Sequence, residues 1–301
     1  MQFQPYSSPA RPFIIGLAPL DSDAFLLLDK ERLAFRAQKQ ALYDAHYDDV
    51  CRARSDTVDG QTEAARLITQ CLMSQHAASF TVTEETITDK QSGISFERPE
   101  RSATPLADAA LLVQDDLLLM RRQDDGWRLV AASLCFPSSW NLHEKFDKPL
   151  EAIHGPVPMD EKMHLRIRRI FDSMRISVPL WRENWGITSD GDLRHDRREN
   201  QRIPARENVH GDLHLRVEYQ TLHKLPGGAK DTAGDILFTV GVRTRAMRDI
   251  ARSEIGKKTL QSLLDHYRAM PASQRDYKGL GEDPDALIGR LETYVRNSAS
   301  A

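Results

Sequence analysis

One histidine stands in a segment whose backbone has little conformational freedom. His154 is followed directly by Gly155-Pro156-Val157-Pro158. Proline fixes its own φ and pushes the preceding residue toward an extended conformation, so two prolines so close together restrain this stretch. Imidazole is the commonest metal-binding side chain. His154 is therefore a candidate metal ligand, although a lone histidine is more often a solvated or hydrogen-bonded structural residue.

A second candidate is the polar face of a strand that contains the residues Arg216-Val217-Glu218-Tyr219-Gln220. Strand periodicity places Arg216, Glu218 and Gln220 on one face and the two apolar residues on the other. The pattern alone favours a strand face exposed to solvent, on which Arg216 and Glu218 form a local ion pair that contributes little to stability. If the face is enclosed, Glu218 is a candidate acid or base and Arg216 a candidate partner for an anionic group such as a carboxylate.

Two aromatic-containing turns, Asn184-Trp185 and Phe136–Trp140, could wall a flat apolar cofactor pocket. Core packing is the commoner use of tryptophan and is favoured for both. The three cysteines are Cys51, Cys71 and Cys135, which are far apart and form no metal-binding pair. We expect them to be buried small hydrophobic residues.

Composition excludes several classes of function. The 301 residues are 40% hydrophobic and carry a net charge of -3, so neither nucleic acid nor an anionic membrane is expected as a main partner. No apolar run approaches the roughly 18 residues of a membrane span. The first residues lack the pattern of a signal peptide, so we expect a cytoplasmic protein. No GxGxxG or GxxxxGK[ST] motif supports dinucleotide or P-loop phosphate binding.

Hydrophobic periodicity predicts helices at both ends of the chain and strands in the middle. The first twenty residues are expected to form an arm that packs on a neighbour through Phe13, Ile14, Ile15 and Leu17. The expected helices cover 24–50, 57–78, 105–113, 161–174, 244–270 and 284–296. The expected strands cover 80–89, 94–96, 117–121, 127–136, 183–188, 213–222 and 236–242. Short helical turns are expected within 142–153 and a mobile polar loop at 189–211. This order predicts an α+β fold with antiparallel strands.

The pattern also suggests three parts that together make one compact unit. The arm and a helical pair occupy residues 1–79, a β-rich core occupies 80–243, and helices complete the chain over 244–301. Within the core, the outward face of the helix at 161–174 carries Arg166, Arg168 and Arg169. We interpret this run as a solvated helix face rather than a docking surface for an acidic partner.

Five segments, taken in order, resemble one protein family. They are LVAASLCFPSSW, EKFDKPLEAIHGPVP, ENWGI, LRVEYQTLHKLP and ILFTVGVRT. Together they resemble the haem-dependent oxidative N-demethylase family, over a region from Phe13 to the final helix. Any one of these segments alone would be a weak signal, whereas their order is specific.

The resemblance implies a fold and an activity. The core would be a PAS-like antiparallel sheet that binds a b-type haem and has extra helices around it. The activity would be oxidative removal of a methyl group from a small secondary amine such as dimethylamine, with dioxygen as oxidant and formaldehyde as product. Electrons would come from NADPH through a partner reductase that carries flavin and an iron–sulfur centre.

The resemblance also implies roles for individual residues. His154 would be the axial ligand of the haem iron, and Trp185 would border the cofactor. Arg216 and Glu218 would form an inward-facing polar pair near the haem. One of the pair would meet a haem propionate, and the other the amine substrate or a proton path. The chain departs from the family pattern at Tyr219, at His223-Lys224 and at Met159-Asp160, which leaves open the substrate and the surface that receives electrons.

Two other functions are compatible with the same resemblance. PAS-like domains are used mostly for sensing, so the chain could be a haem-binding sensor or gas-binding module. A sensor is normally fused to an output domain, and the sequence contains no such domain, which favours an enzyme. A structural subunit that has lost haem would be expected to lack His154, and His154 is present.

Overall fold

The computed structural model describes residues 14–153, 155, 157, 160–196, 212–227, 234–278 and 284–298. Within these residues the fold is α+β, as predicted. One sheet has seven strands in the order β1-β8-β9-β10-β6-β7-β2, a second has three in the order β3-β4-β5, and neighbouring strands in both are antiparallel. The strands are β1 (Ala18–Pro19), β2 (Cys51–Ala53), β3 (Phe80–Val82), β4 (Thr86–Asp89), β5 (Ser95–Glu97), β6 (Asp116–Gln123), β7 (Gly126–Ser133), β8 (Leu180–Thr188), β9 (His214–Lys224) and β10 (Ile236–Ala246).

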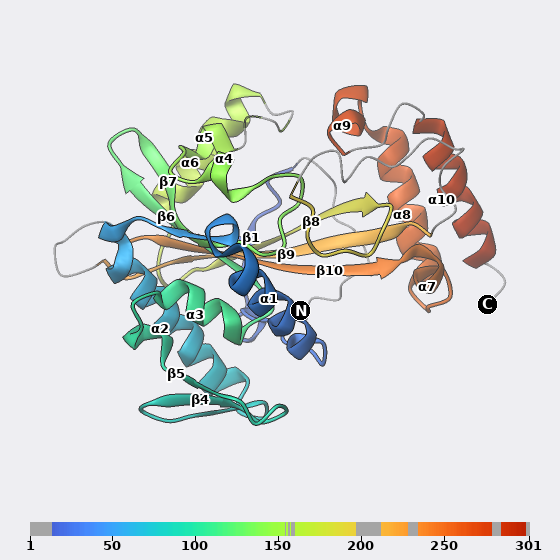
Figure 1. Cartoon of the computed structure of the whole chain (residues 1–301). Coiled ribbons are helices and arrows are strands. Elements are labelled where there is room, and N and C mark those ends of the chain that lie inside the picture. The colour runs from blue at the N-terminus through green and yellow to red at the C-terminus, as the bar shows by residue number, and fades with distance from the viewer. Residues whose placement is uncertain are drawn as a thin grey trace.

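The helices surround the large sheet on both faces and at one end (Figure 1). Helices α2 and α3 lie on one face with the small sheet, and α4, α5 and α6 lie on the other. Helices α7, α8 and α10 gather where β10 ends. The helices are α1 (Arg32–Val50), α2 (Val58–Gln75), α3 (Pro105–Leu112), α4 (Leu142–Lys145), α5 (Leu150–Ile153), α6 (Glu161–Ser173), α7 (Met247–Ala251), α8 (Gly256–Ala269), α9 (Ala272–Tyr277) and α10 (Pro284–Ser298). The division of the chain at residues 79 and 243 stays a prediction.

Strand β9 is an interior strand of the large sheet, and its side chains alternate between the two faces of the sheet. It pairs along its length with β8 on one side and with β10 on the other. Tyr219 packs into the apolar cluster that contains α2 and α3, and Val217 into the cluster that contains α8 and α10. The alternating residues Arg216, Glu218 and Gln220 face the opposite side, as the predicted strand period requires.

The first predicted helix begins eight residues later than its sequence pattern suggested. Phe25 and Leu26 are 4% and 1% exposed and belong to the core without being helical. The ring of Phe25 lies 3.9 Å from that of His223. This apolar segment therefore packs on the sheet in a non-helical conformation despite its helical spacing, and α1 begins only at Arg32.

The helix predicted for 244–270 is also wrong in its first part. Strand β10 continues to Ala246 because it stays paired with β9 as far as His214. Two helices follow in place of one, and Gly256 begins the second. A Cβ at Gly256 would lie 2.1 Å from the carbonyl oxygen of Ile250, so only glycine fits this close approach. Neither β2 nor α9 was expected.

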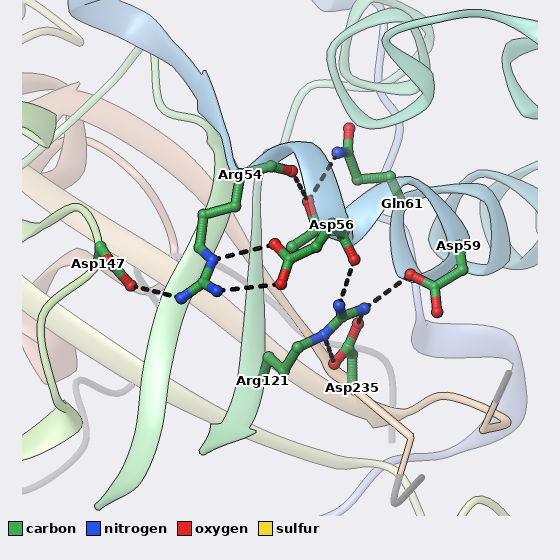
Figure 2. A network of polar contacts seen from close by, with 8 residues as sticks. Arg54, Asp56, Asp59, Gln61, Arg121, Asp147 and Asp235 are labelled. Atoms are coloured by element: carbon green, nitrogen blue, oxygen red, sulfur yellow. Dashed lines mark hydrogen bonds and ion pairs between the residues drawn. The ribbon is translucent and has the colours of Figure 1, made fainter. Parts of the chain in front are cut away.

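A charged network ties the start of α2 to the strands (Figure 2). The Arg121 guanidinium on β6 donates to both oxygens of Asp235, at 2.8 and 2.7 Å, and to Asp59 at 2.8 Å. It also donates to the carbonyl oxygen of Asp56. These bonds hold α2, β6 and the residue before β10 in one arrangement, and they raise the pKa of Arg121 further above its already high value.

A second arginine of this network reaches the segment between α4 and α5. Arg54 donates to Asp56 and, through Nη1, to the Asp147 carboxylate at 3.2 Å (Figure 2). The backbone N–H of Asp147 also donates to the carbonyl of Leu129 on β7 at 2.8 Å. The segment that leads toward His154 is therefore anchored on β7 and on the residue after β2.

Candidate functional site

A cavity of about 730 Å³ lies on the face of the sheet that carries α4, α5 and α6. Small-molecule and cofactor sites generally measure roughly 300–1,000 Å³, so the volume suits a ligand of that class. Side chains from three neighbouring strands make its floor: Leu118 and Met120 of β6, Glu218 and Gln220 of β9, and Phe238 and Val240 of β10.

Helix α6 and the N-terminal segment enclose the cavity. Helix α6 contributes Met163, Ile167 and Phe171, which share its inner face at helical spacing. Its arginines at 166, 168 and 169 are exposed, as the interpretation of a solvated face predicted. Ile14, Ile15 and Leu17 line the cavity too, so these three predicted anchors of the arm contact the rest of the chain. The fourth, Phe13, lies outside the described residues.

Three of the four predicted site residues line this one cavity. They are Trp185, Arg216 and Glu218, which come from β8 and β9. The fourth, His154, lies outside the described residues, but Ile153 and Val157, close to it in sequence on either side, line the cavity. No histidine of the described part of the chain is among the lining residues.

Arg216 and Glu218 are buried, at 1% and 6% exposure, so the interpretation of a solvent-facing strand is wrong. The Arg216 guanidinium donates through Nη1 to the carbonyl of Leu193 at 2.7 Å. Through Nη2 it donates to the carbonyls of Phe136 and Pro137 at 2.8 and 3.3 Å. Backbone carbonyls thus occupy both terminal nitrogens of the guanidinium, and Nε lies 3.6 Å from Glu218 Oε1.

The carbonyls that hold Arg216 are themselves fixed by a buried aspartate. Asp116, at the start of β6, accepts the backbone N–H groups of Cys135 and Phe136 at 2.9 and 2.8 Å. Pro137 also accepts the backbone N–H of His195 at 3.0 Å, so the loop after β8 is joined to the same turn. Residues up to 196 of the predicted mobile loop at 189–211 therefore pack on the core, while the rest lies outside the described residues.

Glu218 lies among donors that favour its ionised form. Its Oε2 accepts a bond from Asn184 Nδ2 at 3.0 Å and another from Gln220 Nε2 at 2.9 Å. Burial alone would raise the pKa of Glu218, but Arg216, the Asn184 bond and the charge of Lys278 together hold it below its usual value. The side chain is thus a buried carboxylate that remains charged at neutral pH and can receive a cation.

Two cations at this site were not identified from the sequence. Arg182 of β8 lines the cavity, and its buried Nε has no hydrogen-bond partner among the described residues. Its alternation with Asn184 along β8 could have indicated its position. Lys278, which directly follows α9, also lines the cavity, and its Nζ lies 3.3 Å from Asn184 Oδ1. No sequence signal indicates Lys278, because only the tertiary fold brings it to β8.

Other candidate chemistry has no support in the described residues. No group of three or more His, Cys, Asp or Glu side chains there is arranged to hold a metal ion directly. The three cysteines are buried and unpaired, as expected, and burial raises the pKa of Cys51 to about 11. Within the same ranges, no helix has both the length and the hydropathy that a bilayer span requires.

Comparison with known proteins identifies the family. No curated protein matches the chain. One family model does, over residues 16–288, which include every strand of both sheets and every described residue of the cavity except Ile14 and Ile15. Its description is a haem-dependent oxidative N-demethylase, alpha subunit-like. The chain therefore belongs to the haem-dependent oxidative N-demethylase alpha subunit-like family.

Proposed function

We propose that this chain is the haem-binding catalytic subunit of an enzyme that removes a methyl group from a small methylated amine. The observation that carries the proposal is the cavity of about 730 Å³, in which an apolar region adjoins a buried, ionised carboxylate. The family description supports haem dependence and oxidative N-demethylation as the class of reaction. A small secondary amine such as dimethylamine is the substrate class that we propose.

The residues present suit a haem. Apolar side chains of the sheet and of α6 would contact the macrocycle, and His154 would bind its iron as axial ligand. The buried and unpartnered Nε of Arg182 suits a propionate carboxylate better than Arg216, whose terminal nitrogens already donate to carbonyls. Bound b-type haem would supply the activation of dioxygen. The PAS-like description of the sheet belongs to the same proposal.

Glu218 would orient the substrate. An amine is mostly protonated at neutral pH, and a buried, ionised carboxylate is a natural partner for an ammonium group. Arg216 would be a positioning residue, because it keeps Glu218 ionised and is itself fixed through the turn that Asp116 holds. Trp185 would border the same region of the cavity.

Electrons would reach the haem from a separate protein. The alpha subunit-like description implies further subunits. We propose that NADPH is the ultimate donor and that a partner reductase with flavin and an iron–sulfur centre transfers the electrons. The sequence has no GxGxxG motif, which agrees with a nicotinamide site on the partner.

An absorption spectrum tests the proposal. The protein, expressed with a haem precursor, should show a Soret band at one haem per chain, and the reduced band should shift with carbon monoxide. His154→Ala should lose most of the haem while remaining folded. His143→Ala is the matched control, since His143 is half-exposed, bonds Asp49 and does not line the cavity.

Full haem content in His154→Ala would exclude His154 as ligand. Absence of a Soret band after reconstitution with haemin would overturn the haem function, and haem without demethylation of any methylated amine would favour a sensor.

A further inference from the structure

The ammonium group of Lys278 lies in an unusually complete set of cation-binding groups. Its Nζ donates to Asn184 Oδ1 at 3.3 Å and to the carbonyl oxygen of Trp185. It also lies 5.2 Å from the centre of the Trp185 ring, on the ring face. Glu218, whose Oε2 is bonded to the same Asn184, attracts it electrostatically.

These groups are the ones that recognise amine ligands in proteins. The face of a tryptophan is the best aromatic partner for a cation, and methylated ammonium groups are the ligands that such faces bind most often. A carboxylate adds the opposite charge, and the two carbonyl oxygens accept hydrogen bonds from any N–H that the ligand retains. All of these residues line the cavity, and the position of the Lys278 ammonium shows that one cation can contact Asn184 and the Trp185 ring together.

We propose that Glu218, Asn184 and Trp185 form the recognition site for the substrate's ammonium group, and that Lys278 occupies this site until the substrate displaces it. Lys278 is thus an internal competitor. The choice of a methylated amine as the ligand rests on the proposed function. The cation site itself does not, because it requires no haem.

The position of Lys278 makes displacement possible. The residue directly follows α9, a helix of six residues with no buried side chain, and reaches into the cavity from the surface. Its four-carbon stem allows the ammonium to leave without movement of the backbone. Burial lowers the pKa of Lys278 to about 8, and the attraction of Glu218 does not offset this because Arg182 also repels the charge. The ammonium of lysine is strongly hydrated in water, and burial at this site removes that hydration. The charged form of Lys278 is therefore less stable here than in water.

Calorimetry with tetramethylammonium chloride provides the test, because this cation has a permanent charge and cannot titrate. Lys278→Met removes the competitor, so it should bind tetramethylammonium about tenfold more tightly than the wild-type protein, equivalent to about 1.4 kcal/mol. Lys257→Met is the matched control, since Lys257 is exposed on α8 and lies outside the cavity. It should bind as the wild-type protein does. Glu218→Gln should weaken binding in either background.

The wild-type protein supplies a second, independent measurement. Its affinity for tetramethylammonium should rise between pH 7.5 and 9.5, because Lys278 loses its charge in this range, and Lys278→Met should show no such rise. The charged groups that act on Lys278 are Glu218 of β9 and Arg182 of β8. Glu218, whose pKa is held below its usual value, stays ionised over this range, and a guanidinium does not lose its proton in proteins. The series begins above the ordinary range of imidazole titration because His266 of α8 stacks on Trp185.

Three results would overturn the inference. One is unchanged or weaker binding by folded Lys278→Met, which would make Lys278 a structural tie between α9 and β8. Another is a wild-type affinity that does not change with pH, and this result is informative even if Lys278→Met fails to fold. The third is an absence of tetramethylammonium binding in every variant. A missing Soret band would overturn the proposed function and leave these three results unaffected, so the two failures can be told apart.

Discussion

At the scale of single residues, Asp115 is the most unusual group away from the cavity. It is 1% exposed, and neither carboxylate oxygen has a hydrogen-bond partner among the described residues. Nη1 of Arg243 is also buried and unpartnered there, and a Cβ at Gly241 would lie 2.9 Å from Asp115 Oδ1 and 3.1 Å from that nitrogen. Burial raises the pKa of Asp115 from 3.8 to about 6, although the charges of Arg243 and Lys39 oppose the rise.

Asp115→Asn should therefore stabilise the protein at neutral pH. A raised pKa in the folded state means that the ionised form disfavours folding, with a cost that is absent below about pH 4 and complete above about pH 6. The free energy of unfolding should increase by about 1–3 kcal/mol at pH 7.5 and hardly change at pH 4. Urea unfolding of the variant and the wild-type protein at both pH values measures this. A loss of stability at pH 7.5 would show that the carboxylate has a partner that its neutral amide cannot replace.

The adjacent residue supplies the contrasting control. Asp116 accepts one backbone N–H on each carboxylate oxygen. An asparagine has only one carboxamide oxygen, so Asp116→Asn leaves a buried N–H unsatisfied and should cost about 1–3 kcal/mol at pH 7.5. Burial raises the pKa of Asp116 as well, so opposite signs for the two Asp→Asn changes would show that the two accepted N–H bonds outweigh the cost of the buried charge at Asp116. A change of the same sign in the free energy of unfolding of both variants at pH 7.5 would contradict this account.

At the scale of elements, local periodicity predicted most of the sheet. The alternation in β9 assigned Arg216 and Glu218 to one face because side-chain direction in a strand depends only on the strand's own period. Whether that face is enclosed depends on α6 and the N-terminal segment, which lie far away in sequence, so the pattern alone favoured solvent. Lys278 was missed for the same reason. The haem-ligand role that we propose for His154 rests on the family resemblance, because a lone histidine has no specific spacing.

The start of α2 is where two elements constrain each other most closely, and it supports a paired prediction. A Cβ at Gly60 would lie 1.9 Å from Asp235 Oδ2, which cannot move away without breaking its bond to Arg121 (Figure 2). A Cβ at Gly289 in α10 would meet nothing within 4 Å. Alanine favours a helix over glycine by about 1 kcal/mol, so Gly289→Ala should stabilise by up to that amount. Gly60→Ala should instead destabilise by about 1–3 kcal/mol.

Thermal and urea unfolding of both glycine variants would test this pair. Arg121→Met provides a further comparison, since it removes the partner of Asp235 and leaves a buried carboxylate without its counter-ion. Because Asp235 would then be free to move, the additional cost of Gly60→Ala should be smaller in the Arg121→Met background. Stabilisation by Gly60→Ala in the wild-type background would show that α2 can shift away from the strands.

At the scale of the whole molecule, the large sheet separates a cavity side from a structural side. The cavity lies against α4, α5 and α6, whereas α2, α3 and the small sheet cover the opposite face (Figure 1). The structural side has a continuous apolar cluster, and Arg32 and Arg36 are both paired to Asp89 at 3.1 and 2.7 Å. The cavity side has its apolar surface around an open volume. Its stability therefore depends on what fills that volume.

Hydrogen exchange of haem-loaded and haem-free protein should show this asymmetry. A ligand that binds only the folded state stabilises it, and exchange slows most where local opening exposes the ligand's own contacts. Loading should therefore protect amides of α6 and of the residues around Leu17, which line the cavity, far more than those of β4 on the opposite side. The lining positions Met163, Ile167 and Phe171 define the peptides to follow, and Thr86–Asp89 is the internal reference. An equal change on both sides would mean that loading acts only on global unfolding, and unchanged exchange in α6 would place the haem away from this cavity.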